Sequence, residues 1–410
     1  MGAFDSNVRT TVLLVVGLAA IFVGLVFSPV VLSIGTILTI TVLVTNTELG
    51  LSYYWKRGLP STLSSSLFWG LAGLYLVLFY NVWLTEDWDY FLGRLRIKIP
   101  LLLLPLAWAA LSLERPEADI DRAGRKWLTG GLALVLAGVL INYGFNFTEF
   151  NDMIRRGQPI PVPRGNHIRF SLLIAITSVV GIDGWLRYRS RWLLLTGLFL
   201  FVGLHLLAVR SGLATAYLGL LILGTRWAFR RRNFRLLMGV VAGLMLLPVL
   251  TYVAVPSFRT KMQYMRYELL HRDMQQDQGK YSDAGRFASI HLGLEVWREY
   301  PLIGVGYGNI SLAMERKFAE ALPGVPAMRP HNQFVSALVG GGVVGFAITL
   351  VCFLAIGFGG GRWRDPLFFA LWAMLLGSCL VENTLETSVG VTLFTLTLLL
   401  FAYPPWRKPG

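Results

Sequence analysis

The chain has 410 residues and a formal net charge of +14, from 37 Lys and Arg against 23 Asp and Glu. Charged residues nevertheless make up only 15% of it and hydrophobic residues 55%, whereas a typical soluble domain is about 25% charged. This composition excludes an ordinary soluble domain, a disordered chain and a disulfide-rich secreted domain. The basic residues lie between long apolar runs, so we expect no nucleic-acid partner.

Apolar runs long enough to cross a bilayer recur along the whole chain. A helix needs about 20 residues to span the hydrocarbon core. The sequence therefore predicts an all-α polytopic membrane protein with about twelve transmembrane helices, the first two joined by a tight turn at Ser28 and Pro29. The predicted spans are 10–27, 30–47, 62–84, 97–113, 128–147, 168–186, 191–209, 212–228, 236–255, 332–358, 366–383 and 389–404. The N-terminal run lacks a small-residue cleavage site and is not expected to be a signal peptide.

Lys and Arg cluster in the short segments on one side of these spans. Clusters lie at 122–126, 187–191, 230–235 and 362–364. Because positive residues favour the cytoplasmic side, both termini are predicted to be cytoplasmic. The clusters are expected to fix orientation and to contact membrane lipid headgroups. Asp183, near an inner helix end, is expected to pair with the arginines at 187–191.

The spans divide the chain into three predicted parts: helices one to nine in 1–255, a periplasmic loop domain in 256–331, and helices ten to twelve with a short cytoplasmic tail in 332–410. The loop domain is too small to stand alone and is expected to be partly helical and packed on the mouths of the spans. A second outer loop, 148–167, is rich in proline and is predicted to be extended.

One stretch of the predicted loop domain, Phe287–Trp297, has helical periodicity. Ile290, Leu294 and Trp297 fall on one face of that helix. Further along, the glycines of Gly304–Asn309 alternate without the strand and helix that a dinucleotide site needs. We expect a turn that permits close backbone approach. Gly340–Gly342, inside the tenth span, predicts close helix packing or local unwinding.

Three arginines lie at the outer ends of predicted spans. Arg210 sits between two apolar runs with almost no loop, Arg169 begins the sixth span and Arg259 follows the ninth. One guanidinium group can bind two phosphate oxygens at once. These arginines therefore predict an anion site at the membrane surface. The alternative for each is an interfacial anchor whose charge reaches the headgroups.

His331 stands out among the five histidines because it precedes the tenth span directly, in Pro330-His331-Asn332-Gln333. Pro330 fits the first turn of a helix, which would place His331 near a helix N-terminus. The positive end of the helix dipole favours a neutral imidazole, which is a competent general base. The alternative is a histidine that only caps the helix.

The acidic residues suggest no metal site. Glu382 and Glu386 flank Asn383 at the outer end of the eleventh span, where they would either neutralise the arginines or bind an acceptor hydroxyl. No acidic or His-rich cluster is present, and both cysteines lie inside apolar runs. We therefore expect neither a metal nor another cofactor.

The stretch 283–346 resembles the O-antigen ligase/polymerase superfamily. The resemblance rests on Arg286 and Trp297, on the run Tyr300–Asn309, on His331-Asn332-Gln333-Phe334 and on Gly341–Gly345. In addition, Val209-Arg210-Ser211-Gly212 is similar to a motif that the family places at an outer hairpin, although Val replaces the usual Ser before the arginine.

This resemblance implies a glycosyltransferase of the bacterial inner membrane with a periplasmic active site. The expected donor is a polysaccharide linked to undecaprenyl pyrophosphate, and the expected acceptor is lipid A-core. The family's essential histidine and arginine correspond to His331 and Arg210. The residues expected to bind pyrophosphate or acceptor are Arg259, Arg169, Arg286, Asn332 and Glu382.

Three alternatives remain open from the sequence. An O-antigen polymerase adds glycan to glycan, and a protein O-oligosaccharyltransferase adds it to Ser or Thr; both share much of the signature. The basic loop before His331 favours a ligase, because the lipid A-core acceptor is anionic. A secondary transporter is disfavoured, since the ionisable residues gather at one face rather than at mid-span.

Overall fold

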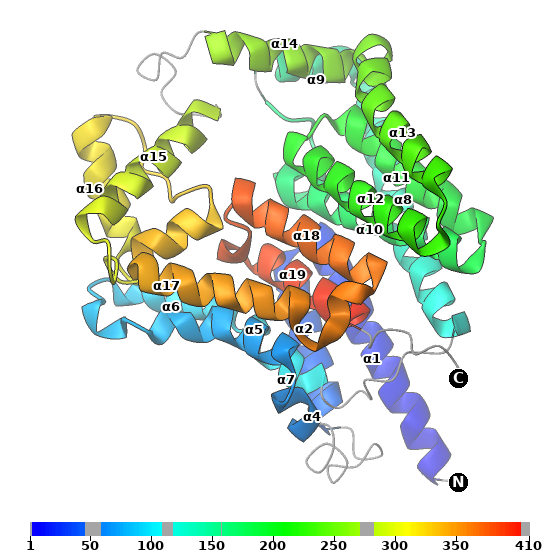
Figure 1. Cartoon of the computed structure of the whole chain (residues 1–410), viewed down its shortest axis with the longest axis horizontal. Helices are drawn as coiled ribbons and strands as arrows, with labels where there is room; N and C mark the ends of the chain where they lie inside the picture. The colour runs from blue at the N-terminus through cyan, green and yellow to red at the C-terminus, as the bar shows by residue number, and fades with distance from the viewer. Residues whose placement is uncertain (1, 46–58, 109–117, 157, 271–282, 403–410) are drawn as a thin grey trace.

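A computed structural model describes residues 2–45, 59–108, 118–156, 158–270 and 283–402 (Figure 1). Within these residues every regular element is a helix, as the sequence predicts. Parts of the predicted spans 30–47, 97–113 and 389–404, of the loop domain at 271–282 and of the cytoplasmic tail lie outside the described residues.

The first half of the chain contains the following helices. They are α1 (Gly2–Val26), α2 (Pro29–Thr45), α4 (Leu59–Leu63), α5 (Ser66–Leu76), η2 (Val77–Phe79), η3 (Val82–Leu84), α6 (Trp88–Lys98), α7 (Pro100–Trp108), α8 (Ala118–Phe145), α9 (Phe147–Arg155), η4 (Pro163–Gly165), α10 (His167–Tyr188) and α11 (Arg191–Leu207). Pro100 begins α7, where its missing N–H costs nothing. The turn at Ser28 and Pro29 lies between α1 and α2, as expected.

The second half continues the all-helical pattern. Its elements are α12 (Arg210–Arg231), α13 (Phe234–Ala254), α14 (Pro256–Leu270), α15 (Asp283–Glu299), α16 (Ile310–Ala321), α17 (Gln333–Phe358), η5 (Gly359–Arg364), α18 (Pro366–Val381), η6 (Thr384–Glu386) and α19 (Ser388–Phe401). The described part of the predicted loop domain contains the three helices α14, α15 and α16, joined and followed by non-helical segments.

Six helical stretches are long and apolar enough to cross a membrane. They are Ser66–Leu84, Ala118–Phe145, His167–Tyr188, Arg210–Arg231, Leu237–Ala254 and Gln333–Arg364. Five shorter apolar helices fall on other predicted spans, namely Val12–Val26, Pro29–Leu43, Arg191–Leu207, Pro366–Val381 and Ser388–Phe401. The chain is thus a helical membrane protein, and twelve spans remain a prediction.

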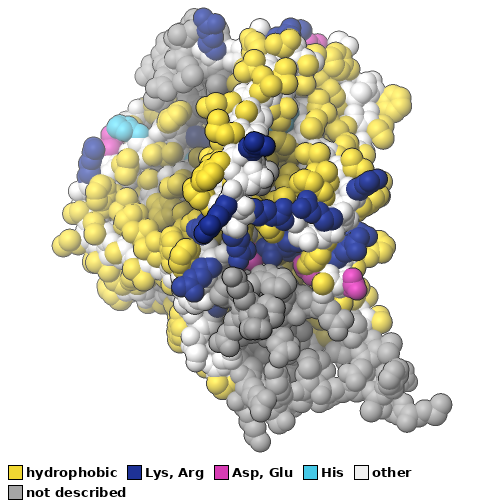
Figure 2. Space-filling model, turned by 45° about the vertical axis from the view of Figure 1, so that its right-hand side comes forward, with side chains coloured by type: hydrophobic (Ala, Val, Ile, Leu, Met, Phe, Trp, Pro, Cys, Tyr) yellow, Lys and Arg dark blue, Asp and Glu magenta, His cyan; other side chains and the backbone are white. Residues whose placement is uncertain are grey.

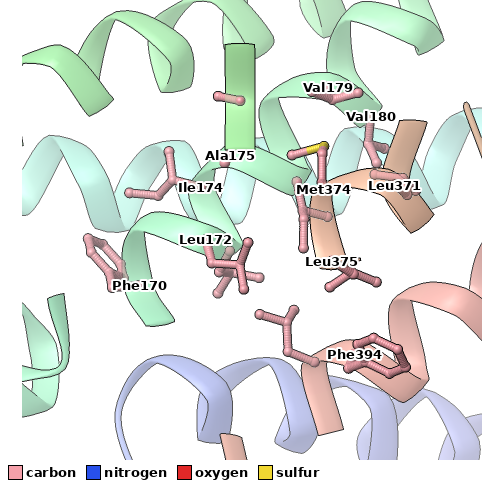
Figure 3. Packing of buried hydrophobic residues seen from close by; sticks show 14 of the residues in the cluster. Phe170, Leu172, Ile174, Ala175, Val179, Val180, Leu371, Met374, Leu375 and Phe394 are labelled. Atoms are coloured by element: carbon pink, nitrogen blue, oxygen red, sulfur yellow. The ribbon is translucent and has the colours of Figure 1, made fainter. Parts of the chain in front are cut away.

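The helices pack around α10 and α18, which lie in the middle of the molecule (Figure 1). Figure 3 shows Leu172 and Val179 of α10 on the side of Met374 and Leu375 of α18, with Ile174 on the opposite side of α10, all of them buried. At the other extreme, α13 exposes large apolar side chains along its length, including Met245 and Val253. Such a helix is stable only against lipid or another apolar partner.

Basic side chains form a band across one face, below a broad hydrophobic surface (Figure 2). Arginines end α10 and α12 and occupy η5, in agreement with a membrane boundary at this level. Asp183 accepts hydrogen bonds there from Arg187 of its own helix and from Arg125 of α8 at 2.9 Å. The pairing expected for Asp183 is confirmed, and it ties α8 to α10.

The outer loop 148–167 is not extended throughout, contrary to the prediction. Residues 147–155 form α9, because Phe150 and Ile154 lie one turn apart and are buried on one face. The prolines begin only at Pro159, and the chain is non-helical from there to η4. The proline argument therefore holds for the second half of the loop alone.

The helix expected around Phe287–Trp297 is confirmed as α15, but its buried face differs from the expected one. Leu292 and Val296 are 4% and 3% exposed, and they pack with residues of α16 and α17 in one cluster. Ile290 and Leu294 are only partly buried at its edge. Periodicity predicts the helix, but two apolar faces compete for burial.

The tenth predicted span, α17, is broken at Gly342, where φ is 61° and ψ −160°. The loop 301–306 crosses the break and satisfies the freed backbone groups. Val343 N–H donates to Pro301 O at 2.9 Å, and Val305 N–H donates to Val339 O at 2.9 Å. Both expectations for the glycines, close approach at 304–309 and unwinding at 340–342, are confirmed at this one junction.

Two side-chain amides join the junction to the segment that follows α5, Asn81 from that segment and Asn309 from the N-terminus of α16. Asn81 is fully buried and donates to Ile303 O at 2.9 Å and to Gly340 O at 2.7 Å. Asn309 donates to Leu84 O at 2.6 Å and accepts from the Glu86 N–H at 2.8 Å. The first half of α17, which follows directly on His331 and Asn332, is therefore held against the rest of the fold.

Gly342→Ala is expected to destabilise the protein strongly. A Cβ at this position would lie 2.3 Å from the Leu302 carbonyl, in a backbone conformation that costs an L-residue 1–3 kcal/mol. We expect the free energy of unfolding to fall by about 2 kcal/mol or more, measured by thermal unfolding in detergent. Gly138→Ala in α8, where nothing lies within 4 Å, is the control. Equal stability of the two variants would contradict the account of the break.

Candidate functional site

The site begins at the N-terminus of α17. Asn332 is the N-cap, and its Oδ1 accepts from the N–H groups of Phe334 at 2.8 Å and Val335 at 3.1 Å. Its amide nitrogen donates to Leu380 O at 2.7 Å, which fixes α17 to the end of α18. His331 lies just before the cap, as expected, while Pro330 precedes the helix instead of entering its first turn. Since Asn332 caps α17, the alternative in which His331 only caps the helix is excluded.

His331 is held by a buried serine of α15. The backbone N–H of His331 donates to Ser289 Oγ at 3.2 Å, and the ring Nδ1 lies 3.3 Å from the same oxygen. Ser289 is fully buried, and its hydroxyl also contacts the Arg286 carbonyl at 2.7 Å. The imidazole therefore has a defined orientation.

An arginine–glutamate pair lies beside the histidine. Arg286 NH2 is 3.0 Å from Glu382 Oε1, and the Glu382 side chain is 3% exposed while that of Arg286 is 33% exposed. The carboxylate thus holds the guanidinium in place and leaves part of it accessible. Of the two roles expected for Glu382, the pairing with arginine is the one that the contacts favour.

Arg169, at the start of α10, reaches the loop that follows α18. Its guanidinium donates to Thr384 Oγ1 at 3.1 Å and to Asn383 O at 3.2 Å, and it is 5% exposed. Arg169 and Arg286 therefore hold the segment 382–384 from two sides. This loop, the N-terminus of α17 and the N-terminus of α10 come together at one end of the bundle.

The charges around His331 keep its ring neutral. Burial, followed by the guanidinium of Arg286, lowers the pKa of His331 to about 4, against a smaller opposite effect of the Arg329 carbonyl. The charges of Arg329 and Arg169 contribute to this lowered pKa. Three arginines from α15, α10 and the loop before α17 thus disfavour imidazolium. The ring is an unprotonated base at neutral pH.

Arg210 and Arg259 have different surroundings. Arg210 begins α12, and the next turn packs tightly on α10, where a Cβ on Gly212 would lie 2.5 Å from the Ser171 Cβ. Arg210 therefore lies at the end of the bundle that holds Arg169. Arg259 Nε instead donates to the Tyr252 carbonyl at 3.1 Å, at the end of α13. This contact favours the interfacial-anchor alternative for Arg259.

A second charged cluster, not expected from the sequence, surrounds Glu386. Lys98 Nζ lies 2.6 Å from Glu386 Oε1, and Gln333 donates to the same oxygen at 3.0 Å. Arg94 donates to the Glu386 carbonyl at 2.9 Å. Burial opposes ionisation of Glu386, but the Lys98 charge and the hydrogen bonds from Gln333 and Lys98 together outweigh it and lower the pKa of the carboxyl. The four-residue spacing of Arg94 and Lys98 was the available sequence signal.

A polar pocket of about 370 Å³ opens beside His331. Its lining includes Ser311 and Glu315 of α16, Arg329, and Asn383 of the loop after α18. His331 and Arg329 line this pocket, whereas Arg286 and Arg169 act on the histidine from outside it. Among the described residues, no group of three or more His, Cys, Asp and Glu has a geometry that would hold a metal ion.

Comparison with known proteins supports the resemblance found in the sequence. Residues 195–350 match a protein-family model described as O-antigen ligase. The matched segment runs from α11 into the second half of α17 and includes Arg210, Arg286 and His331. No curated protein matches the chain.

Proposed function

We propose that this chain, which belongs to the O-antigen ligase superfamily, transfers polysaccharide from undecaprenyl pyrophosphate to lipid A-core on the periplasmic face of the inner membrane. The observation that carries the proposal is the position of the neutral His331, which lines an open polar pocket and lies within reach of the charges of Arg286, Arg329 and Arg169. The orientation with both termini in the cytoplasm follows from the basic clusters at the opposite ends of the spans.

In the proposed reaction, the acceptor hydroxyl attacks the anomeric carbon of the donor and gives its proton to His331. A carbon–oxygen bond forms to the acceptor as the bond to the pyrophosphate breaks, so the anomeric configuration inverts. Undecaprenyl pyrophosphate departs with the bonding electron pair. Arg286, Arg210 and Arg169 would stabilise its developing charge, a type of contact worth roughly 3–4 kcal/mol each.

Arg259 has a lesser role in this proposal. Its guanidinium is engaged at the end of α13, so it would contact the donor only from the membrane surface. Asn332 would act by holding the start of α17 and hence His331. Glu382 would orient Arg286, because the two side chains form an ion pair with the carboxylate buried.

Deletion of the gene tests the proposed class of reaction. A ligase deletion leaves long polymer on the lipid carrier and none on lipid A-core. Single O-units on lipid A-core would instead indicate a polymerase, and loss of glycan from a protein would indicate a protein O-oligosaccharyltransferase. Normal envelope glycans in the deletion strain would overturn the whole proposal.

The pocket beside His331 is proposed to bind the acceptor sugar. Glu315 would accept hydrogen bonds from sugar hydroxyls, and its charge would repel a pyrophosphate. We expect Glu315→Gln to raise KM for lipid A-core about 10-fold, the loss of one charge-assisted hydrogen bond, with KM for the donor unchanged. Glu320→Gln, on the same helix but lining a different pocket, is the control. A rise in the donor KM alone would assign the pocket to the donor.

A further inference from the structure

The hydrogen-bond pattern of Ser289 determines which nitrogen of His331 carries the proton. Ser289 Oγ contacts three groups: the Arg286 carbonyl at 2.7 Å, the His331 backbone N–H at 3.2 Å and the His331 Nδ1 at 3.3 Å. A hydroxyl has one hydrogen and two lone pairs. A carbonyl only accepts, so the shortest contact uses the single hydrogen of Ser289.

Both remaining contacts must then supply hydrogen to Ser289. The backbone N–H of His331 does so necessarily. For the ring, the bond requires hydrogen on Nδ1, because a bare Nδ1 would face a lone pair of the serine oxygen. A neutral imidazole carries one hydrogen, which leaves the lone pair on Nε2.

We infer that Ser289 is a positioning residue that holds His331 in the tautomer with hydrogen on Nδ1 and so makes Nε2 the basic nitrogen. The inference rests on the proposed function for the role of that base, and on the contacts above for the tautomer itself. Acting through His331, Ser289 would have no contact with the substrate. It would set which ring nitrogen faces the acceptor hydroxyl.

A simpler role for Ser289 is the ordinary bond of a helical serine to its own helix. Ser178 of α10 provides that case in the same protein, since it is fully buried and donates to Ala175 O at 3.0 Å. Ser178→Ala is therefore a matched control for loss of a buried helical hydroxyl. An effect seen in Ser289→Ala and absent from Ser178→Ala belongs to the contact with His331.

The tautomer is tested directly by ¹⁵N NMR of the full chain with labelled histidine, reconstituted in lipid nanodiscs. The His331 signals are assigned by their absence in His331→Ala. We expect a protonated Nδ1 and an unprotonated Nε2 at neutral pH. Hydrogen on Nε2 with an unprotonated Nδ1 overturns the inference. This readout needs no activity, so it stands or falls apart from the proposed function.

Kinetics supply the second test. Ser289→Ala is expected to lower kcat about 10-fold, the loss of one hydrogen bond, with KM for donor and acceptor unchanged. Ser289→Thr, which retains the hydroxyl, should recover most of that loss. Wild-type kcat in Ser289→Ala, or a decrease no larger than that of Ser178→Ala, contradicts the positioning role. If the alanine variant does not fold, the spectrum of the wild-type protein still decides the matter.

Discussion

Replacing His331 by alanine is expected to abolish glycan transfer while leaving the protein folded. Loss of a general base costs about 10²–10⁴-fold in rate. The side chain is half-buried at a loop, and Asn332 rather than His331 caps α17, so the helix keeps its start. The measurement is transfer by purified protein in lipid nanodiscs, with thermal unfolding as the check on folding.

The matched control for this substitution is His291→Ala on α15. His291 lies two residues beyond Ser289, with its side chain 68% exposed and paired with Glu295 at 3.2 Å. Its removal should leave transfer unchanged. Full activity in His331→Ala, or equal losses in both variants, would remove His331 from the role of base.

The pH dependence of the wild-type protein follows from the same geometry. Burial and the charges of Arg286, Arg329 and Arg169 together lower the pKa of His331 to about 4. The base is neutral above that value, so kcat/KM should persist well below pH 6.5 and fall only as the pH approaches 4. Between pH 6.5 and 4 the unfolded state binds more protons than the folded state. The free energy of unfolding therefore decreases as the pH is lowered through that window. An acidic limb near pH 6.5 would show that the ring is not held neutral.

Conservative replacement of the donor-site arginines is expected to have the second-largest effect. Arg286→Lys keeps a charge beside the buried Glu382 but loses the planar fork that binds two phosphate oxygens. Arg210→Lys makes the same change at the start of α12. We expect each to lower kcat by about 10²–10³-fold, as for removal of one donor to a developing negative charge.

The control for the arginine series is Arg298→Lys, an exposed position near the end of α15. It should leave transfer unchanged. Arg259→Lys distinguishes a donor-site arginine from an interfacial anchor. A modest decrease in kcat agrees with an anchor at the end of α13. Loss of activity in Arg259→Lys together with full activity in Arg286→Lys would move the pyrophosphate site away from His331.

The sequence predicts most of the helices because their apolar runs are long and their ends are marked. The predicted spans 168–186 and 191–209 differ by at most two residues at each end from α10 and α11. It does not predict α6 or α9, which have only 11 and 9 residues. Such helices depend on tertiary packing more than on their own sequence, and a hydropathy window averages over them.

The candidate site divides in the same way. His331 and Arg286 are identified by the family resemblance and Glu382 by its place at the outer end of the eleventh predicted span, and the structure brings the three together at the end of the bundle. The residues that hold these side chains in place are not identified from the sequence, because their partners are distant along the chain. Ser289, for example, lies 42 positions before His331. Nothing in the local sequence distinguishes such a serine from one that bonds only its own helix.

The central claim is that the chain transfers glycan to lipid A-core with His331 as the base. The most direct test is an assay of the purified protein reconstituted with undecaprenyl-pyrophosphate-linked glycan and lipid A-core. The account predicts glycan attached to lipid A-core with inverted anomeric configuration, and no product with His331→Ala. Folded wild-type protein that forms no such product, or His331→Ala protein that forms as much of it, would contradict the account.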